Sequence, residues 1–586
     1  MYQQVLDPVA GSLGWSALFA ALPIIGLFVL LGVVRAKAWV AAAGGLAVAL
    51  LVAVAAYGMP ADQALLTATQ GGAFGLFPLA WTFTTAIWIY TMTVGTGHFD
   101  VLRRSFVRVS DDRRIQAIVI AFCFGSLLEA LAGQGTPVAI TSVMLLAVGF
   151  RPVLAASTAL VANTVPAAFG PLGLPITTLA KVTGLPADDL GAMAGRQVPI
   201  LAVVIPLLVV AIVDGRRGVR EQWWPALACG LSFGLAQFAT ANYLSVALAD
   251  IVAALVSVGV VTLVVRRRPV TGTAPAPVLV GRSGSAVGGS AGGSGVGGSA
   301  GGSGVGGSAV GGSAGGSGVG GSAADEVHGA SLDADAAASD SRADVLRAYA
   351  PYAAIVAIFS LSQWSPITRI LDSATTTFNW PGLHLLTSAG RTSSLPIYKL
   401  NLLLAPGSLL FLAGLLTMVV LRVRPGVAVR AYGRAVSQLR WAILTVTCLL
   451  ALSFVMNASG QATTLGHWMA GAGGLFAILS PILGWLGVAL TGSDTSSNSL
   501  FGALQVSAAG QTGLDPTLLA AANASGGVVG KMISLQNLTI SAGAVGLSGQ
   551  EGNLFRRMFG WSLLLLSGMC LIVGLQATPV LSWMVP

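Results

Sequence analysis

A series of apolar runs, each about as long as a bilayer is thick, constrains this chain more than any other feature. A helix needs about 20 predominantly apolar residues to cross the hydrocarbon core. The 586-residue chain has about twelve such runs and only 9% charged residues, whereas soluble proteins have about 25%. We therefore predict an all-α polytopic membrane protein with about 12 transmembrane helices. The predicted spans are about 13–34, 39–57, 73–94, 153–172, 198–213, 225–240, 246–265, 348–363, 401–421, 441–457, 515–530 and 559–580.

Basic residues between the runs predict the orientation. Lysine and arginine cluster at 35–37, 103–114, 214–220 and 266–268. With the N-terminus outside, all four segments lie on the inner side, as the positive-inside rule requires. Because this bias explains the net charge of +9, we expect no nucleic-acid partner.

Other features argue against a cleaved signal peptide and against a metal or cofactor site. The first apolar run, Leu13 to Val34, is too long for the core of a signal peptide and predicts a membrane helix. The four cysteines lie in or beside apolar runs without paired spacing, which is typical of small buried hydrophobic side chains. We expect no metal and no cofactor. The cysteines are Cys123, Cys229, Cys448 and Cys570.

A segment of low complexity divides the chain. Residues 282–323 repeat glycine, serine, alanine and valine, a composition typical of a flexible coil. We predict a cytoplasmic linker over 269–345. It would join an N-terminal membrane half, 1–268, to a C-terminal membrane half, 346–586.

Each half contains two short apolar arms around a polar tip. The first pair, near 115–150, surrounds Gly133-Gln134-Gly135-Thr136-Pro137. The second, near 470–509, surrounds Gly492-Ser493-Asp494-Thr495-Ser496-Ser497-Asn498. Such polar stretches are tolerated at membrane depth where they are buried in protein or line a wet cavity. We predict two re-entrant hairpins.

The two halves match as an inverted repeat. Gly492 follows Gly133 by 359 residues, and Asn523 follows Asn163 by 360. Each asparagine lies about thirty residues after a tip, in a helix interrupted by glycine or proline. The predicted topology inserts the first hairpin from inside and the second from outside. Transporters built in this way hold their substrate at the bilayer midplane between broken helices.

The candidate site combines the two tips with the two broken helices. Free N–H groups and helix dipoles at broken ends favour a carboxylate, and hydroxyl or amide groups can donate to its oxygens. The alternative is that these small polar residues only hold helices together. The candidate substrate-binding residues are Gly133, Gly135, Thr136, Asn163, Thr164, Ser493, Thr495, Ser496, Ser497, Asn498, Asn523 and Lys531.

Two carboxylates are candidates for proton coupling. Glu129 lies in the first arm and Asp494 in the second tip. Burial favours the neutral form of a carboxyl group, so either could carry a proton, although each could also be structural. Lys531 has two interpretations: a lysine extending to the inner face, or a partner of Asp494 or of the substrate anion.

Five stretches of the sequence carry a resemblance to a known family: Phe122–Glu129, Gly133–Ile140, Asn163-Thr164, Gly484–Asn498 and Ala521–Ser534. They look like motifs of the lactate permease family of bacterial 2-hydroxy acid transporters. The resemblance covers nearly the whole chain except the linker. It implies uptake of L-lactate, D-lactate and glycolate by proton symport across the bacterial inner membrane. Departures from the family pattern are Ala130, Gln134 and Leu535.

We therefore expect proton-coupled uptake of lactate or a similar small 2-hydroxy acid anion, with no enzymatic activity. One alternative is a sodium-coupled carrier of another small carboxylate, in which tip carbonyls with Asn163 and Asn523 bind the ion. Others are an intramembrane hydrolase that uses a serine near His467, and a channel. Saturable accumulation driven by a gradient would exclude the channel.

Overall fold

The structure is a computed structural model. Its described residues are 2–34, 36–107, 109–131, 133, 135–267, 341–362, 364–388, 390, 392–393, 395–547 and 550–586. The predicted linker, apart from 341–345, lies outside them, as does Gln134.

Helices make up most of the described chain, and eleven of them are long and apolar enough to cross a membrane. The predicted class, an all-α polytopic membrane protein, is confirmed. The helices are α1 Leu13–Phe28, α2 Ala38–Ala55, α3 Ala61–Phe74, α4 Trp81–Gly95, α5 His98–Val107, α6 Arg113–Ala117, α7 Gly125–Glu129, α8 Thr136–Ala147, α9 Pro152–Ala162, α10 Leu174–Thr183, α11 Ala187–Tyr243, α12 Ala249–Arg267, α15 Arg342–Ser362, α16 Ser365–Asp372, α17 Pro406–Val420, α18 Pro425–Ser459, α19 Gln461–Met469, α20 Phe476–Thr491, α21 Asp494–Thr512, α22 Pro516–Gly530, α23 Leu535–Ala544 and α24 Glu551–Gln576.

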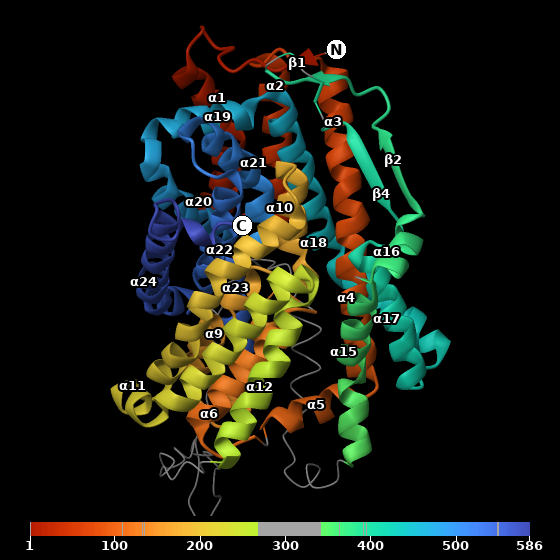
Figure 1. The fold of residues 1–586 in the computed structure, drawn as a ribbon, viewed down its shortest axis with the longest axis vertical. Coiled ribbons are helices and arrows are strands. Elements are labelled where there is room, and N and C mark those ends of the chain that lie inside the picture. The colour runs from red at the N-terminus through yellow and green to blue at the C-terminus, as the bar shows by residue number, and fades with distance from the viewer. Residues whose placement is uncertain are drawn as a thin grey trace, which may run out of the picture.

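Short strands lie in the half of the molecule that carries the N-terminus (Figure 1). β1 (Tyr2–Gln3) pairs in parallel with β3 (Leu385–Leu386). β2 (Thr375–Asn379) pairs antiparallel with β4 (Ile397–Asn401). β2, β3 and most of β4 lie between the spans predicted at 348–363 and 401–421, where runs of threonine and apolar residues favour extended backbone.

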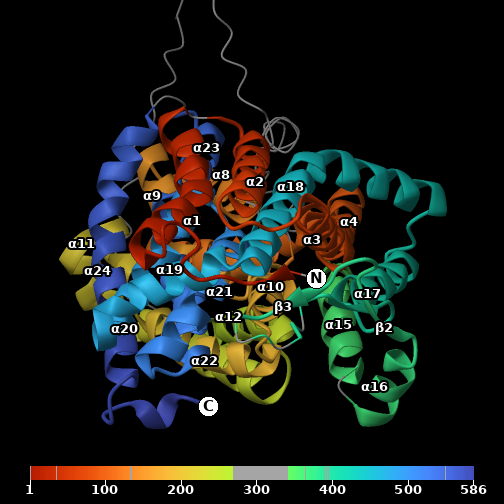
Figure 2. The same ribbon diagram turned by 90° about the horizontal axis from the view of Figure 1, so that it is seen from above.

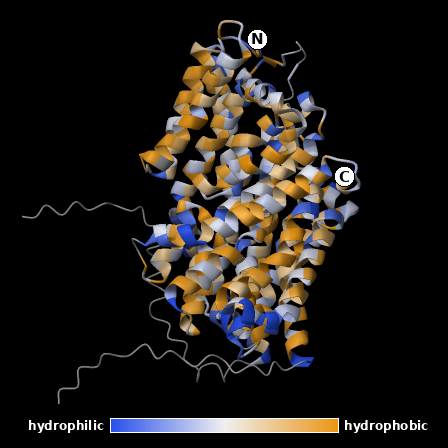
Figure 3. Ribbon diagram, turned by 90° about the vertical axis from the view of Figure 1, so that its left-hand side faces the viewer, coloured by the Kyte–Doolittle hydropathy of each residue, from blue (hydrophilic) through white to orange (hydrophobic). Residues whose placement is uncertain are grey.

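Hydropathy changes along the long axis of the molecule. Hydrophobic residues cover the helices over most of their length, and hydrophilic residues gather mostly towards the end opposite the N-terminus (Figure 3). The basic ends of α6 and α12 lie there (Figure 1). This arrangement agrees with a bilayer around the middle of the molecule.

Two groups of helices are visible from above, with α18 between them (Figure 2). One contains α3, α4, α15 and α17; the other contains α11, α20, α22 and α24 (Figure 2). α18 packs against α2, α3 and α4, and also against α21. It is longer than the span predicted at 441–457 because basic residues from 425 onward extend the helix outside the apolar run.

The helix α11 covers two predicted spans, 198–213 and 225–240. Its backbone leaves helical values at Asp214, Gly215 and Gln222. The two spans are therefore separate helical segments joined by a break, at the basic stretch where a loop was predicted.

The second group contains two helical hairpins. The first consists of the π-helical segment η3 (Ile118–Phe124), α7, a tip whose described residues are Ala130, Leu131, Gly133 and Gly135, and α8. The second consists of α20, a tip at Gly492 and Ser493, and α21. Insertion of the two hairpins from opposite faces of the bilayer stays a prediction.

Each half also contains a broken helix. α9 ends at Ala162 and is followed by two short 3-10 turns, η4 (Val165–Ala167) and η5 (Pro171–Gly173), before α10 begins. The sequence predicted that the span 153–172 is interrupted at Asn163, Pro166 and Gly170, and the structure agrees. Proline and the positive φ angles at Gly170, Leu172 and Gly173 keep this segment from forming one continuous helix. In the second half, η8 (Lys531–Ile533) separates α22 from α23.

The hairpins and broken helices exchange partners between halves. α8 of the first hairpin packs against α23, and α21 of the second packs against α10. A β-carbon at Gly135 would lie 3.1 Å from Asn537 Oδ1, and one at Gly492 would lie 2.5 Å from Gln536 Oε1. Both tips therefore contact the first turn of α23.

Candidate functional site

An ion pair between the two halves lies at the centre of the site. Lys531 Nζ is 2.5 Å from Glu129 Oε1, and both side chains are almost fully buried. Asn163 Nδ2 donates to Glu129 Oε2 at 3.1 Å. Glu129 ends α7, Asn163 follows α9 and Lys531 begins η8, so the hairpin and both broken helices contribute one group each.

This pairing decides between the interpretations of Lys531. The residue is 5% exposed, so it does not extend to an aqueous face. Its partner is Glu129. The sequence had suggested Asp494 as one possible partner, and the structure does not pair Lys531 with it. Asp494 lies instead against α22, where a β-carbon at position 527 would overlap its carboxylate. Glycine at 527 therefore admits this close approach.

The second tip is shaped by its first residues. Gly492 ends α20 with φ +76°, a conformation that glycine adopts readily. Ser493 caps α21, and its hydroxyl accepts a hydrogen bond from the backbone N–H of Ser496 at 3.3 Å. Asp494 follows in the first turn, where the helix dipole favours a negative charge.

Amide side chains connect Asp494 to the rest of the site. Asn498 Nδ2 donates to Asp494 Oδ2 at 3.3 Å and to the carbonyl of Pro175 at 3.1 Å. Asn523 Nδ2 donates to Asn498 Oδ1 at 2.9 Å, and Gln505 Nε2 donates to Asn523 Oδ1 at 3.3 Å. Within the described residues, Asp494 Oδ1 has no hydrogen-bond partner.

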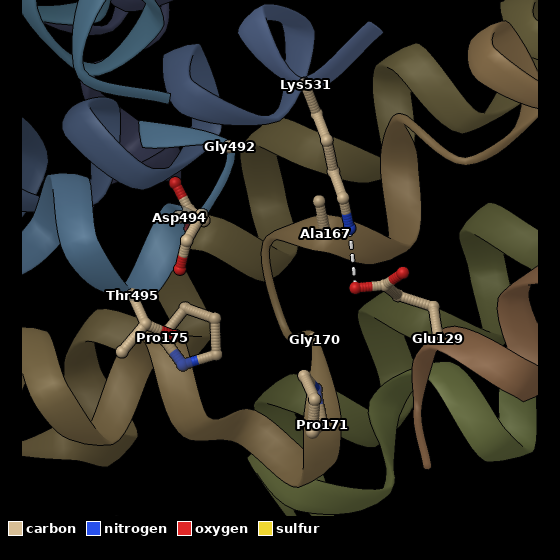
Figure 4. A pocket seen from close by; sticks show the side chains of 10 residues that line it. Glu129, Ala167, Gly170, Pro171, Pro175, Gly492, Asp494, Thr495 and Lys531 are labelled. Carbon is tan, nitrogen blue, oxygen red and sulfur yellow. Dashed lines mark hydrogen bonds and ion pairs between the residues drawn. The ribbon is translucent and has the colours of Figure 1, made fainter. Parts of the chain in front are cut away.

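A small cavity lies between these groups. Figure 4 shows Asp494 and Thr495 on one side, with the pair formed by Lys531 and Glu129 on the other. The cavity volume is about 20 Å³, close to that needed for a single water. An organic anion therefore requires the walls to move apart. The lining residues are Glu129, Ala167, Gly170, Pro171, Pro175, Gly492, Ser493, Asp494, Thr495 and Lys531.

Other predicted site residues form the walls or lie behind them. A β-carbon at Gly133 would lie 2.6 Å from a ring carbon of Pro171, so the first tip packs on the break that lines the cavity. Gly135 and Thr136 begin α8 next to α23. Thr164 donates its hydroxyl to the carbonyl of Val161 at 2.7 Å.

The serines of α21 also bond to backbone. Ser497 donates its hydroxyl to the carbonyl of Gly484 at 3.1 Å. Ser496 uses its N–H in the Ser493 cap, and its side chain is not among those that line the cavity. Of the polar cluster, Ser493, Asp494 and Thr495 line the cavity.

A third buried carboxylate was missed by the sequence reasoning. Asp250, in the first turn of α12, is 1% exposed. Gln237 Nε2 donates to its Oδ1 at 2.8 Å. Asp250 lies inside the run predicted as span 246–265, and an acidic residue within an apolar run was the available signal.

The hydrolase alternative finds little support in the geometry around His467. Ser507 Oγ is 3.5 Å from His467 Nδ1, but it donates to the carbonyl of Thr463 at 3.1 Å. The serine proton is therefore directed away from the imidazole. In the part of the chain that the structure describes, no group of three or more histidine, cysteine, aspartate or glutamate residues could hold a metal ion.

Comparison with known proteins gives long matches. The chain matches the L-lactate permease family over residues 16–273 and 325–580. It is 38% identical over 590 residues to the glycolate permease GlcA of Escherichia coli (strain K12), with 98% of each chain covered. It is 36% identical over 609 residues to the L-lactate permease of Bacillus subtilis (strain 168), with 100% of each chain covered.

A solved structure is similar at lower identity. The Neisseria gonorrhoeae protein MtrF, described as illuminating a class of antimetabolite efflux pumps, aligns with a TM-score of 0.44 and 14% identity. The alignment covers 88% of this chain and 84% of that chain. At this similarity the likeness carries no argument about substrate or mechanism.

Proposed function

This chain belongs to the L-lactate permease family, and on that premise we propose that it takes up lactate, and related 2-hydroxy monocarboxylates such as glycolate, together with protons. The names of relatives that match over at least 98% of both chains support the substrate class. The observation that carries the mechanism is the buried pair of Lys531 and Glu129 on the wall of a small cavity, opposite the second tip.

Lys531 is the group that binds the substrate carboxylate. It is the basic residue among those lining the cavity, and a buried ammonium needs a negative partner. In the substrate-free state Glu129 is that partner. A lactate carboxylate can take its place only when Glu129 no longer competes for the ammonium.

Protonation of Glu129 removes this competition and couples the transport of the proton to the transport of the lactate anion. A proton without the anion leaves the Lys531 charge unpaired, and the anion without a proton leaves two carboxylates against one ammonium. Both states bury an uncompensated charge, which costs several kcal/mol. The pair therefore favours states in which proton and anion are both present or both absent.

The second tip binds the other end of the substrate. The Asp494 carboxyl group has an oxygen without a partner among the described residues and lines the same cavity. It accepts a hydrogen bond from the 2-hydroxyl of lactate, and Ser493 and Thr495 lie beside it. This geometry gives 2-hydroxy acids an advantage over acids that lack the hydroxyl.

The proposal extends to orientation and organisation. The N-terminus lies outside, and the linker is on the cytoplasmic side of the bacterial inner membrane. The membrane part consists of two halves, 1–268 and 346–586, and one part of the protein moves against the other to give alternating access. The basic residues at the linker end of the molecule support this orientation.

Uptake into proteoliposomes tests the proposal. Purified protein is reconstituted, and labelled lactate is supplied outside with an alkaline interior. We expect accumulation that saturates with lactate and collapses when a protonophore removes the gradient. No uptake with a proton gradient and none with a sodium gradient would rule out transport of lactate. Uptake with sodium alone would replace the proton by sodium.

A further inference from the structure

Beyond the substrate cavity, we propose that Asp250 is a second proton-binding residue, which shares its proton with Gln237 and exchanges it with Glu129. This inference rests on the proposed proton coupling and adds a residue to it. The motif resemblance and the cavity lining point to neither member of the pair. The argument depends on which buried atoms have hydrogen-bond partners.

The pair formed by Asp250 and Gln237 is short of one hydrogen. Gln237 Nε2 donates to Asp250 Oδ1 at 2.8 Å. The remaining oxygens, Asp250 Oδ2 and Gln237 Oε1, are both buried and have no partner among the described residues. Both are acceptors while Asp250 is charged. A proton on Oδ2 would supply the donor that Gln237 Oε1 lacks and close a ring of two hydrogen bonds.

The other carboxylates of the site have different hydrogen-bond partners. Both oxygens of Glu129 are paired, one with Lys531 and one with Asn163, which suits a charged group. Asp494 also has an amide donor, but the oxygen of that amide, on Asn498, already accepts from Asn523. Asp250 differs from both, because one oxygen of Asp250 and the side-chain oxygen of its amide donor, Gln237, are both without a partner among the described residues.

Asp250 lies directly behind the wall of the cavity. The turn η6 (Val246–Leu248) precedes it by one residue and packs against η5, which contributes Pro171 to the lining. A β-carbon at Gly173 would lie 3.2 Å from the backbone nitrogen of Ala247. The helix α12 also packs against α7, which ends at Glu129.

The charges that act on Asp250 come from the same site. Glu129 and Lys531 both interact electrostatically with it. Of the other elements packed on α12, η5 and η6 carry no titratable residue. Cys123 of η3 lies next to Cys229 of α11 and accepts a hydrogen bond from Ser257, two turns along α12 from Asp250. Arg196 of α11 donates to Asn242 and to the carbonyl of Met584, and the other charged residues of α11 lie in its first turn or at the break near 214–221.

The remaining neighbours of α12 do not change this conclusion. α15 begins with charged residues, the last of which is Arg347. The titratable residues after it are Tyr349 and Tyr352, which are neutral at physiological pH. The first-turn position in α12 favours the charged form through the helix dipole. That contribution is small beside the cost of burying an unpaired charge.

The functional consequence is a proton store in contact with the coupling pair. When Glu129 is paired with Lys531, the proton is held by Asp250. When lactate approaches Lys531, the proton moves to Glu129, and Asp250 becomes the anion until it is reprotonated. Net uptake needs Asp250 to give up and regain this proton in every cycle. Exchange of internal for external lactate does not, because one lactate can replace another while Glu129 keeps its proton.

The substitution Asp250→Asn tests this role with little change in shape. An asparagine can form the same ring with Gln237 and imitates the permanently protonated residue. We expect lactate exchange to change by less than about threefold. With a gradient of one pH unit, wild-type protein accumulates lactate up to about tenfold and the variant does not accumulate it.

A matched control and a direct readout complete the experiment. Asp188→Asn changes an exposed aspartate in the first turn of α11 and should leave both assays unchanged. The infrared spectrum of the wild type at neutral pH should contain the carbonyl band of a protonated carboxyl group that Asp250→Asn removes. If the variant also loses lactate exchange, the band still tests the proposal, because it is measured on folded wild-type protein.

The outcomes separate the two proposals. Coupled uptake by Asp250→Asn equal to wild type, or a carbonyl band that persists in the variant, overturns the role of Asp250 and leaves proton-coupled transport standing. Absence of gradient-driven uptake in the wild type overturns the proposed function, and the role of Asp250 with it.

Discussion

The two hairpins share a backbone arrangement and differ in the charges that they carry. With the offset of 359 residues, Asp494 of the second tip corresponds to Gly135 of the first, and Glu129 of the first arm corresponds to Val488. With the offset of 360 residues that relates Asn523 to Asn163, Lys531 corresponds to Pro171. The two hairpins therefore form similar sites with non-equivalent side chains, and the sites have different roles. We call the site around Glu129 the first cradle and the site around Asp494 the second cradle.

Asn163 and Asn523 are polar residues that occupy corresponding positions in the two halves. Asn163 donates directly to Glu129, and Asn523 acts on Asp494 through Asn498. Each broken helix thus supports the carboxylate of its own half. In the proposed mechanism Glu129 of the first cradle takes up and releases the proton, and Lys531 is its charged partner. The second cradle binds the substrate hydroxyl.

The largest expected effect is that of Lys531→Met, which removes the cation from both cradles. Loss of one partner of a buried charge pair costs about 2–5 kcal/mol, so lactate uptake should fall by roughly a hundredfold or more. Uptake in proteoliposomes measures it. The control Lys399→Met changes a lysine whose side chain is 59% exposed. Equal rates for both variants would refute the role of Lys531.

A smaller loss is expected from Gly527→Ala, which affects the second cradle alone. The added methyl group overlaps the Asp494 carboxylate, and overpacking of this kind costs about 1–3 kcal/mol. We expect the apparent KM for lactate to rise by about tenfold or more. Gly543→Ala in α23 adds a methyl group with nothing within 4 Å and is the control. A KM unchanged from the control would place Asp494 outside the substrate path.

The two asparagines distinguish the cradles more finely. Asn163→Ala removes a donor from charged Glu129, worth about 1.5–3 kcal/mol. It should therefore favour the protonated form and move the pH profile of uptake towards higher pH. Asn523→Ala should raise the KM for lactate with a smaller movement of the profile. Identical profiles for the two variants would contradict the division of tasks.

The smallest effect is expected from Thr164→Val, next to Asn163. The Thr164 hydroxyl donates to the backbone of its own helix at Val161, and valine has nearly the same shape. Loss of such a bond costs about 1 kcal/mol of stability. We expect the KM for lactate to stay within about twofold of wild type. A tenfold rise would restore Thr164 as a substrate-binding residue, as its sequence position suggests.

Much of the architecture is visible in the sequence because apolar run length and glycine or proline interruptions are local signals. They predict the membrane class, the positions of both tips, and the breaks after Asn163 and near Lys531. They do not predict that Lys531 pairs with Glu129, 402 residues away. That contact depends on how the two halves pack, and no local pattern encodes it.

Two further differences have physical causes. Polar residues do not end a helix once it leaves the bilayer, so α11 and α18 extend beyond their apolar runs. Asp250 is hidden in the sequence because its partner, Gln237, lies on another helix. The acidic residue within an apolar run is a signal, but the sequence does not show that its side chain is buried against another helix.

Lactate binding as a function of pH tests the central claim, that Glu129 and the substrate carboxylate compete for Lys531. The affinity of purified wild-type protein for lactate is measured over a range in which lactate remains an anion, beside Glu129→Gln. Since proton and anion favour each other, wild-type affinity should fall as pH rises. The variant has no charge at this position, so its affinity should be high and nearly constant. A wild-type affinity independent of pH, or a variant with the same pH dependence as wild type, would contradict the account.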